Sequence, residues 1–415
     1  MSKSVIIIGG GIIGLSTAYY LQKEGCDVTV IDKSNFSAGA SYVNAGYITP
    51  SHFIPLSQPG IITKGLKWMF NPESPFYVKP RLDLDFLKWA WAFKKSSTKS
   101  KVEKAIPILK DFNLLSRELY AEMKGSDDFS FHYEKRGLLM FYKSDEVGEE
   151  EWNVGQRGIK EGLKVELLSA SEVKKLEPNV DLDIKGAVYF HSDAHMTPNA
   201  FMKGMYAYLK TKGVKFCRNE AVVDIELSNN SVSKIITDKQ ELKADEVVLA
   251  AGSWSQKLSK KLGINIPVQA GKGYSINVQR PTGISIPSIL CEAKVAVTPM
   301  DGFTRFAGTM EITGINHNIN PVRVNAIAKA AKNYYPNLEI LKSETDSAKC
   351  GLRPCSPDGM PYIGKSIKCK NLTIATGHAM MGWSLGPATG KLISQILLNK
   401  KLAMSIDGFY PDRKF

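Results

Sequence analysis

The sequence predicts an α/β fold, with a Rossmann-like domain assembled from separate chain segments and a second domain built on a mixed β-sheet. Residues 4–32 have the pattern of strand, glycine-rich turn, helix and strand, which begins a doubly wound sheet. Short apolar runs typical of further strands recur between residues 214 and 313. The 415 residues suffice for about two to four domains, and no flexible linker divides them, so we expect interleaved domains.

The N-terminal unit begins with an apolar, β-branched run over residues 4–8, which is typical of a buried parallel strand. Residues 15–24 carry apolar side chains at helical spacing, and Gly25 provides a helix stop. A second buried strand covers residues 28–31 and ends at Asp32. Because parallel neighbours need a crossover connection, this order predicts one βαβ unit.

The remaining elements follow from periodicity and turn chemistry. Helices are expected around residues 84–93 and 106–123, and over 197–212, 323–335 and 386–398. Strands are expected at 214–217, 221–228, 233–237 and 246–249, as pairs within 129–142, and throughout 265–313. Thr197 followed by Pro198 is typical of a helix start.

The composition narrows the class of protein. Hydrophobic residues make up 43% and charged residues 23% of the chain, which excludes a disordered chain. No apolar run of about 18 residues predicts a transmembrane helix, and the N-terminus lacks signal-peptide features. The six cysteines form no Cys-x-x-Cys pair, so a reducing cytoplasm fits best. The net charge of +13 fits an anionic small molecule, a membrane or nucleic acid alike.

The turn after the first strand matches the G-x-G-x-x-G pattern of dinucleotide-binding proteins. Gly9 permits the tight turn, Gly11 the approach of a pyrophosphate, and Gly14 the packing of helix on strand. The helix N-terminus offers N–H groups to phosphate. Asp32, 18 residues after Gly14, stands where an acid binds ribose hydroxyls and repels the 2′-phosphate of NADP. The alternative is a βα turn without a nucleotide.

Three further segments bear on whether the dinucleotide is FAD or NAD, which the glycine pattern leaves open. Residues 39–46 are small and polar, which suits close approach of the backbone to a phosphate and a ring system. Residues 245–255 are a strand that ends in small residues. Residues 377–390 are a glycine-rich loop that runs into the last helix.

These segments resemble, in order and spacing, those of the D-amino acid oxidase-like superfamily of FAD-dependent oxidoreductases, over nearly the whole chain. The resemblance implies FAD held by the N-terminal βαβ unit, with the C-terminal glycine loop near the flavin ring. Four residues would lie near the pyrophosphate and flavin, namely Ser41, Asn44, Ala45 and Gly46. Val223 would bracket the adenine, and residues 382–384 would face the flavin O2 end.

The expected cofactor residues and domain boundaries follow from the glycine pattern and this resemblance together. The cofactor residues are Gly9, Gly11, Ile12, Ile13, Gly14, Asp32, Lys33, Gly39, Ala40, Ser41, Asn44, Ala45, Gly46, Val223, Ala251, Gly252, Trp254, Gly377, His378, Met381, Gly382, Trp383 and Ser384. The FAD-binding domain is expected to comprise residues 1–53, 165–260 and 350–415, and the substrate domain residues 54–164 and 261–349.

A substrate anchor is expected in residues 351–364, whose glycines and prolines narrow the conformations of the segment. There Arg353 can present a fixed fork of donors to a carboxylate. By the resemblance, Arg353 matches the arginine that binds the amino acid carboxylate. The alternative is an arginine in a surface ion pair. Cys350 and Cys355 flank Arg353, and some members of the superfamily attach flavin through a cysteine.

Within the superfamily the chain is most similar to the bacterial D-amino acid dehydrogenases (small subunit), through the aromatic and basic segment 59–70 and through Trp89 and Trp91. This resemblance implies an enzyme of amino acid catabolism that oxidises the CH–NH bond of a D-amino acid. A hydride would pass to flavin N5, the imino acid would hydrolyse to a 2-oxo acid and ammonia, and electrons would reach a quinone or another acceptor.

Two alternatives remain open for the activity. One is a dehydrogenase or oxidase of a cyclic or N-substituted amino acid, such as D-proline, 4-hydroxy-D-proline, sarcosine or glycine. The other is a flavin subunit that acts only within a hetero-oligomeric complex. Oxygen is a further alternative as the electron acceptor.

Several side chains are weaker candidates. Tyr274 is a candidate for the substrate pocket, or else a buried strand tyrosine, and His52 is a candidate for the active site, or else a solvated loop histidine. His191, His195 and His317 have no carboxylate or cysteine at metal-ligand spacing. These three are therefore predicted to be structural, and no metal is expected.

Residues 64–104 contain ten Lys or Arg and four acidic residues, interleaved with aromatic side chains. One interpretation is a peripheral patch on the cytoplasmic face of the inner membrane, which would pass electrons to the respiratory chain. The other is that the tryptophans pack against the substrate domain while the lysines form a solvated face. No nucleic-acid motif accompanies the positive charge, so nucleic acid is not expected as a partner.

Overall fold

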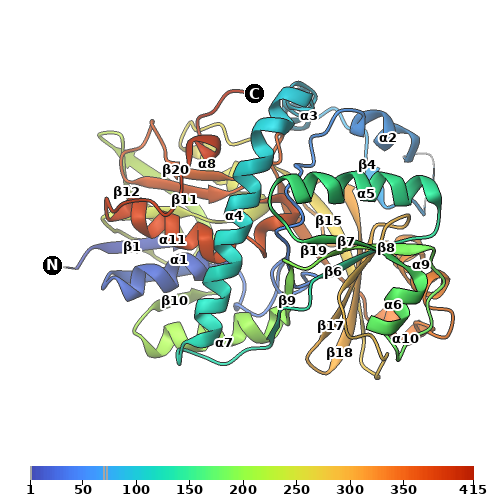
Figure 1. The fold of residues 1–415 in the computed structure, drawn as a ribbon. Helices are drawn as coiled ribbons and strands as arrows, with labels where there is room; N and C mark the ends of the chain where they lie inside the picture. Colours follow the sequence, from blue (N-terminus) through green and yellow to red (C-terminus); the bar gives the residue numbers. More distant parts are fainter. Residues whose placement is uncertain (1, 69–70, 72) are drawn as a thin grey trace.

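Two large β-sheets lie side by side in the computed structural model, which describes every residue except Met1, Met69, Phe70 and Pro72 (Figure 1). The six-stranded sheet lies on the left of that view and the nine-stranded sheet on the right. The predicted insert at 59–70 falls outside the described residues at its last two positions.

The six-stranded sheet confirms the predicted Rossmann-like unit. Its order is β10 (Lys215–Arg218), β2 (Asp27–Asp32), β1 (Ser4–Ile8), β14 (Glu246–Leu249), β21 (Leu372–Thr376) and β20 (Tyr362–Lys365). The strands run parallel except β20, which is antiparallel to β21. Helix α1 (Ile12–Lys23) connects β1 to β2, as predicted from the glycine-rich turn.

Strand β1 illustrates why this sheet is buried on both faces. Val5 and Ile7 pack with α1 and with α11 (Gly386–Leu397), whereas Ile6 and Ile8 pack with a small sheet on the other face. Successive side chains of a strand point to opposite faces, so a continuous apolar run belongs between two layers.

The nine-stranded sheet is mixed, also as predicted. Its order is β19 (Lys349–Cys355), β15 (Gln269–Val278), β18 (Phe303–Ile312), β17 (Val295–Met300), β16 (Ser288–Leu290), β6 (Leu138–Tyr142), β8 (Gly186–Phe190) and β7 (Val165–Ser169), with β4 (Phe76–Val78) beside β18. The β16–β6 and β18–β4 pairs are parallel, and the other pairs are antiparallel.

Helices cover the sheets and join them. Helix α9 (Pro321–Tyr334) packs against the core of the larger sheet. Helix α4 (Lys99–Gly125) runs between the two sheets and contacts α11 (Figure 1). It begins seven residues before the predicted 106–123 helix, because Thr98 caps it and Pro107 is accommodated inside it.

The other elements are short. The helices are α2 (Ile61–Trp68), α3 (Leu84–Ser96), α5 (Asp145–Lys160), α6 (Ala170–Leu176), α7 (Pro198–Thr211), α8 (Ser255–Lys261) and α10 (Lys342–Asp346). One small sheet has the order β3 (Tyr47–Ile48), β9 (Ala194–Met196), β5 (Tyr133–Glu134), and the other β11 (Val222–Ser228), β12 (Ser231–Thr237), β13 (Glu241–Leu242). The predicted pairing within 129–142 is wrong, because β5 pairs with β9 and β6 pairs with β8 and β16.

The strands that form each sheet can be compared with the predicted domain boundaries, which stay a prediction. The six-stranded sheet takes strands from residues 4–32, 215–218, 246–249 and 362–376, so it is discontinuous in sequence. Strands β7 and β8, expected within the FAD-binding segment 165–260, pair inside the larger sheet. We therefore propose that residues 165–190 belong with the substrate domain. No helix among the described residues is long and apolar enough to cross a bilayer.

Candidate active site

A cavity of about 1320 Å³ opens where the carboxyl ends of β1, β2 and β14 face the larger sheet. Ligands of open parallel sheets bind at such strand ends. The lining includes the glycine-rich turn, the loop after β2, the ends of β11 and β14, the middle of β15, β18 and β19, and the loop before α11. Typical small-ligand pockets hold roughly 300–1,000 Å³, so this volume suits a dinucleotide together with a second molecule.

The glycine-rich turn has the steric features of a phosphate-binding turn. Gly9 has φ +113°, and a Cβ there would lie 2.4 Å from the Ala250 carbonyl oxygen. A Cβ on Gly14 would lie 1.8 Å from the Gly9 carbonyl oxygen, so Gly14 allows α1 to pack against the turn. A Cβ on Gly11 would meet only the Ser41 hydroxyl, at 3.3 Å. The space at Gly11 is therefore left open toward the cavity.

Asp32 at the end of β2 orients this turn. The Gly10 N–H donates to Asp32 Oδ2 at 2.7 Å, and the Ser34 N–H and hydroxyl both donate to Oδ1 at 2.7 Å. The Ile12 N–H donates to the Ser41 hydroxyl oxygen at 3.0 Å, which joins the α1 N-terminus to the predicted loop. The predicted turn, acid and loop therefore lie together at one end of the cavity.

The Trp254 ring contacts both a lysine and a histidine at the cavity wall. The Lys33 ammonium lies 3.2 Å from the centroid of the Trp254 ring, and the His317 ring stacks against Trp254 at 6.1 Å. All three residues line the cavity. Lys33 and Trp254 were predicted to lie near the cofactor, whereas His317 was predicted to be structural.

The loop before α11 also lines the cavity. His378 is buried, its Nε2 lies 3.0 Å from the Thr389 hydroxyl, and its Nδ1 has no partner among the described residues. Burial lowers the pKa of His378 to about 3, so the ring is neutral at pH 7. The Thr49 N–H donates to the Ser384 hydroxyl oxygen at 3.0 Å, and the Tyr120 hydroxyl donates to the Trp383 carbonyl at 2.7 Å. These bonds fix the loop.

Arg353 projects into the cavity from β19 and is partly exposed there. Its Nη1 donates to the Thr309 carbonyl at 2.7 Å, and no described carboxylate forms an ion pair with it. Burial lowers the pKa of the guanidinium, yet arginine stays charged in proteins. A Cβ on Gly273 would lie 2.2 Å from Nη1, so Gly273 provides the space for this side chain. The surface ion pair considered as an alternative is therefore absent.

Thr309 is a residue that sequence reasoning missed. It lies where the pairing of β15 with β18 shifts register, and its φ is +70°. A β-branched residue with positive φ is an outlier that persists only when its surroundings hold it, and such strain clusters at functional sites. The bulge turns the Thr309 carbonyl onto Arg353. No sequence signal other than the neighbouring Gly308 marks this bulge.

Both weaker catalytic candidates border the cavity. The Tyr274 hydroxyl donates to Glu311 at 2.9 Å, within a buried group that also holds the Lys272 ammonium. His52 Nδ1 lies 2.9 Å from the Ser51 hydroxyl, which is hydrogen-bonded to buried Asp193. Burial lowers the pKa of His52 to about 4. His52 lies in a loop and is half-buried at the cavity wall, so its role in the active site stays a prediction.

Three predicted cofactor residues, Gly14, Gly46 and Gly377, do not line the cavity. Each packs closely against the protein instead. A Cβ on Gly46 would lie 2.3 Å from the Met196 carbonyl oxygen, and one on Gly377 would lie 2.6 Å from the Tyr362 ring. The other predicted cofactor residues, together with Arg353, Tyr274 and His52, all border this one cavity. Cys350 and Cys355 are not among its described lining residues.

Residues 4–396 match the family described as FAD dependent oxidoreductase (DAO). The chain belongs to this family. It is 33% identical to a D-amino acid dehydrogenase of Helicobacter pylori over 398 residues, 95% of each chain. It is 32% identical to a D-amino acid dehydrogenase of Vibrio vulnificus (strain CMCP6) over 408 residues, 95% of this chain and 96% of the relative.

The same architecture occurs among solved structures. The fold is similar to that of glycine oxidase from Geobacillus kaustophilus, with a TM-score of 0.79 and 20% identity over 100% of both chains. At this identity the likeness concerns the fold alone. It agrees with the pairing of a Rossmann-like sheet and a larger mixed sheet described above.

The residues present fit the cofactor that the family requires. The open space at Gly11 and the N-terminus of α1 suit a pyrophosphate, and the Asp32 carboxylate suits ribose hydroxyls. In the loop before α11, His378 Nδ1 and Trp383 Nε1 are buried polar atoms without partners among the described residues. Buried polar atoms are rarely left unpaired, so a polar ligand in this cavity would satisfy them.

Proposed function

We propose that this chain is an FAD-dependent dehydrogenase that oxidises a D-amino acid at its CH–NH bond, giving a 2-oxo acid and ammonia. The observation that carries the proposal is the unpaired Arg353 guanidinium, which faces the cavity bordered by the dinucleotide-binding turn. A fork of donors without a protein carboxylate suits the carboxylate of a substrate. The two curated relatives named above carry the same activity in their names.

The chain's own residues hold and orient both molecules. In this proposal the turn at Gly9–Gly11 and the α1 N-terminus hold the pyrophosphate, Asp32 holds the ribose, and Val223 borders the adenine. The loop 377–384 borders the ring, where backbone N–H groups of residues 382–384 stabilise negative charge. When bound, FAD supplies a two-electron acceptor for the hydride of the Cα–H bond.

Arg353 binds and orients the substrate in this proposal. A bidentate pair with the substrate carboxylate fixes the amino acid in one orientation relative to the cavity wall. The Thr309 carbonyl accepts from Nη1 and so keeps the fork from rotating. Oxidation removes two electrons and the Cα hydrogen as hydride, and the nitrogen loses one proton to give the imino acid. Water then replaces the nitrogen and releases ammonia.

The amine must be neutral before the hydride leaves, and His52, which lines the cavity, is a candidate to accept its proton. Its pKa of about 4 makes it a weak base at neutral pH, because burial opposes its charged form. We infer that the ammonium proton passes to water instead. His52→Gln is therefore expected to retain turnover within about threefold of the parent protein, whereas a loss of about 100-fold or more would make His52 the base.

The direct test is anaerobic mixing of the yellow protein with D- and L-amino acids and small amines, while flavin bleaching is followed. Bleaching by D-amino acids supports the proposal, and D-proline, 4-hydroxy-D-proline, sarcosine or glycine reacting fastest would select the alternative substrates. Arg353→Ala should retain FAD and lose turnover. Retained turnover in Arg353→Ala would remove Arg353 as the anchor. No bleaching by any compound would favour the subunit of a larger complex, which gel filtration with a partner chain would test.

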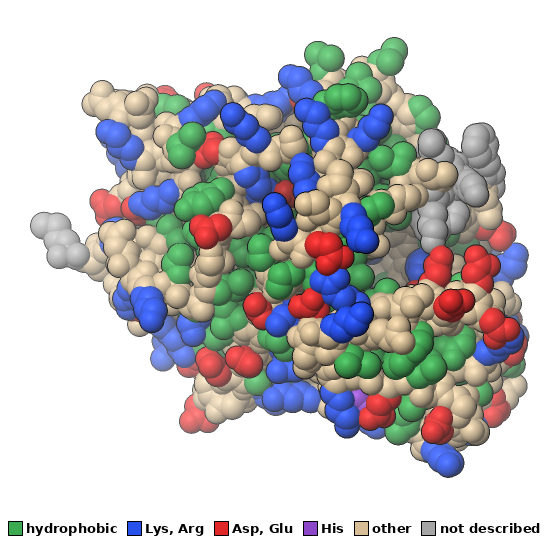
Figure 2. Space-filling view, turned by 45° about the horizontal axis from the view of Figure 1, so that its top comes forward, with side chains coloured by type: hydrophobic (Ala, Val, Ile, Leu, Met, Phe, Trp, Pro, Cys, Tyr) green, Lys and Arg blue, Asp and Glu red, His purple; other side chains and the backbone are tan. Residues whose placement is uncertain are grey.

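We also propose that the electron acceptor is reached at a membrane surface next to α3. Leu82 and Leu84 are highly exposed, as is Trp91, whose ring lies 5.5 Å from the Lys95 ammonium. Figure 2 shows hydrophobic side chains among lysines and arginines along the upper edge of that view. Trp89, in contrast, is buried and its Nε1 donates to the Cys355 carbonyl. Within residues 64–104, Trp89 thus supports packing inside the protein, whereas Trp91 and the exposed leucines support a membrane patch.

This surface can be tested with vesicles that contain anionic lipid. A protein with Leu82→Asp and Leu84→Asp should bind such vesicles at least about tenfold more weakly, since each exposed leucine contributes apolar area to the interface. Ile367→Asp is a matched control, because Ile367 is equally exposed but lies elsewhere. Equal binding of all three proteins, or none by the parent protein, would remove the membrane surface while leaving the enzymatic proposal intact.

A further inference from the structure

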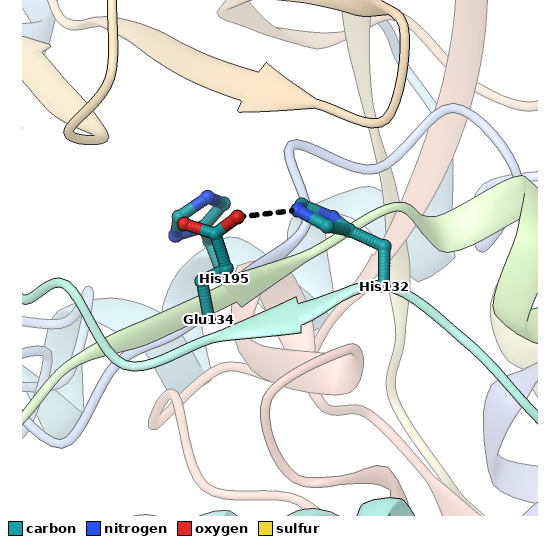
Figure 3. A group of neighbouring side chains, drawn as sticks. All are labelled: His132, Glu134 and His195. Carbon is teal, nitrogen blue, oxygen red and sulfur yellow. Dashed lines mark hydrogen bonds and ion pairs between the residues drawn. The ribbon is translucent and has the colours of Figure 1, made fainter.

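Two histidines and a glutamate lie together on one face of the small sheet β3–β9–β5 (Figure 3). Glu134 of β5 and His195 of β9 are register partners, so their side chains share a face. His132 lies just before β5 and two residues before Glu134, and its side chain rises on the same side of the sheet (Figure 3). None of the three is among the described residues that line the cavity.

The three side chains present ligand atoms to one another. One ligand atom from each residue lies within 4.8 Å of the others. His132 Nε2 and Glu134 Oε1 are 3.2 Å apart, and the two imidazole rings have centroids 5.5 Å apart in an edge-to-face arrangement. Figure 3 shows all three side chains rising from the same side of the two strands.

His195 is the unusual member of the group. It is only 1% exposed, and its Nδ1 has no hydrogen-bond partner among the described residues. An unpaired buried polar atom costs about 1–3 kcal/mol, so such groups are rare in folded proteins. The neighbouring His132 and Glu134 pair with each other and not with His195 Nδ1.

We propose that His132, Glu134 and His195 bind a divalent transition-metal ion of the Zn²⁺ class. Two imidazoles and one carboxylate are a donor set that suits Zn²⁺, whereas Mg²⁺ and Ca²⁺ prefer oxygen ligands. Zinc binds these ligands at about 2.0–2.2 Å, so the ligand atoms of a tetrahedral site lie about 3.3–3.6 Å apart. The His132–Glu134 pair, at 3.2 Å, is close to this spacing, and His195, within 4.8 Å of both, needs to approach by no more than about 1.5 Å.

Neighbouring residues support the orientation of His132. The Thr197 hydroxyl lies 3.0 Å from His132 Nδ1 and also accepts from the Asp301 N–H at 2.8 Å. This contact anchors one ring nitrogen and directs Nε2 toward Glu134. Metal-bound histidines are commonly oriented by a hydrogen bond at the other nitrogen. The half-exposed Glu134 leaves a route for the ion and a fourth position for water.

The position of the site points to a role in holding the structure rather than in the oxidation. β9 lies between β5 and β3, where Tyr47 is the register partner of His195 and also lines the cavity. Asp193, which accepts from Ser51 on the cavity wall, immediately precedes β9. An ion on His195 would therefore fix the strand behind this wall to β5.

Direct metal binding tests the proposal. Tag-free protein with its FAD is treated with a chelator, dialysed and titrated with ZnCl₂ by calorimetry, and the Co²⁺ form is examined for ligand-field absorption. We expect the parent protein to bind one ion per chain. In His132→Ala, Glu134→Gln and His195→Ala, the affinity for Zn²⁺ should fall by more than the roughly 10- to 100-fold loss that follows removal of an outer hydrogen-bond partner. Bound Zn²⁺ should also raise the midpoint of thermal unfolding.

His191→Ala is the matched control. His191 pairs with Glu166 at 3.2 Å, as His132 does with Glu134, but has no second histidine within ligand distance among the described residues. It should bind zinc like the parent protein. Glu134→Gln keeps the shape of a half-exposed side chain, so it remains informative if His195→Ala fails to fold. No stoichiometric binding by the parent protein, or equal binding by Glu134→Gln, would overturn the proposal.

Discussion

Arg353 and its surroundings show how much of a site is decided by residues that never touch the ligand. Gly273 on β15 leaves the space in which the guanidinium lies, and Thr309 on β18 offers the carbonyl that holds it. β15 is paired with both β18 and β19, so the three residues lie across adjacent strands. A substitution at any one of them changes the position of the same fork of donors.

Gly273→Ala is expected to displace Arg353 without affecting FAD. The added Cβ would fall 2.2 Å from Nη1, well inside contact distance, so the side chain has to move. We expect kcat/KM for the best amino acid to fall by about 100-fold, since about 3 kcal/mol of charge-assisted hydrogen bonding is lost. Flavin absorbance and steady-state kinetics check this. Gly125→Ala is the control, because a Cβ there meets nothing within 4 Å. Unchanged kinetics would show that Arg353 does not orient the substrate.

Arg353→Lys is expected to be almost as damaging as Arg353→Ala. Lysine keeps the charge but is a point donor, so it cannot form two parallel hydrogen bonds to a carboxylate. The KM for the amino acid should rise at least about tenfold, and flavin content should stay at the parent level. Stopped-flow bleaching over a range of substrate concentrations measures the effect. Kinetics like those of the parent protein would mean that charge alone suffices.

Asp193 makes stability depend on pH in an unusual direction. Burial raises the pKa of Asp193 to about 7 in the folded protein, whereas an exposed aspartate titrates near 3.9. Between these values the folded state binds the proton and the unfolded state does not, so this group lowers the free energy of unfolding as pH rises. As pH rises from about 4 to about 7, the free energy of unfolding of Asp193→Asn should therefore increase relative to that of the parent protein.

Urea unfolding at pH 5 and pH 7.5 measures this difference between Asp193→Asn and the parent protein. Asp301→Asn is the control, since Asp301 is an exposed carboxylate. His52 acts in the opposite sense, because its pKa is lowered to about 4, and this contribution is present in all three proteins. A difference that does not change with pH would mean that Asp193 is ionised in the folded state throughout.

At the scale of elements, the crossing of α1 and α11 determines where the loop 377–384 meets the cavity. A Cβ on Gly390 would lie 2.5 Å from the Ser16 backbone, so the two helices touch at this glycine. Gly390→Ala should lower the free energy of unfolding by about 1–3 kcal/mol through overpacking. It should also weaken FAD retention, which dialysis and flavin absorbance would measure. FAD retention equal to that of Gly125→Ala would show that α11 does not position the loop.

Elements with strong local patterns could be predicted from the sequence. The helix at 386–398 was predicted nearly to the residue, and the βαβ unit over residues 4–32 was predicted in its order of elements, although α1 begins three residues before the predicted helix at 15–24. Each combines apolar spacing with a glycine that ends or begins it. The pairing of strands within 129–142 was predicted wrongly, because β5 and β6 are adjacent in sequence yet belong to different sheets. Partner choice among strands depends on contacts far along the chain, which a local pattern does not contain.

The candidate site also contains some residues that local sequence signals could indicate and others that they could not. The glycine-rich turn, Asp32 and Arg353 carry signals in their own neighbourhoods, and the structure places them along one cavity, while their roles stay predictions. Thr309 could not be found, because its importance comes from a register shift between β15 and β18. His195 was predicted to be structural and without a carboxylate at metal-ligand spacing. The fold brings Glu134 and His132 beside it across β5 and β9, which sequence spacing cannot show.

For the molecule as a whole, the cavity is enclosed by segments from both sheets, so bound FAD should stabilise them together. Removal of FAD is expected to lower the free energy of unfolding by about 4 kcal/mol when the free cofactor exceeds its dissociation constant about 1,000-fold. Thermal unfolding of the apoprotein with increasing FAD measures this as a rising midpoint. A midpoint that does not respond to FAD would mean that the cofactor binds the folded and unfolded chains equally.

The pairing of β1 with β14 and of β14 with β21 also has a consequence for how the chain is made. Val5 meets Glu246, and Val247 meets Leu372, so the central strands of one sheet are separated by most of the polypeptide. A ribosome therefore releases the first strand long before β14, its neighbour on one side, exists. The early βαβ unit has to wait, with its apolar faces uncovered, until the last helix emerges to cover α1. Synthesis of this protein should accordingly be sensitive to chaperone supply, and chains that stop before α11 should be degraded rather than accumulate as a partial domain.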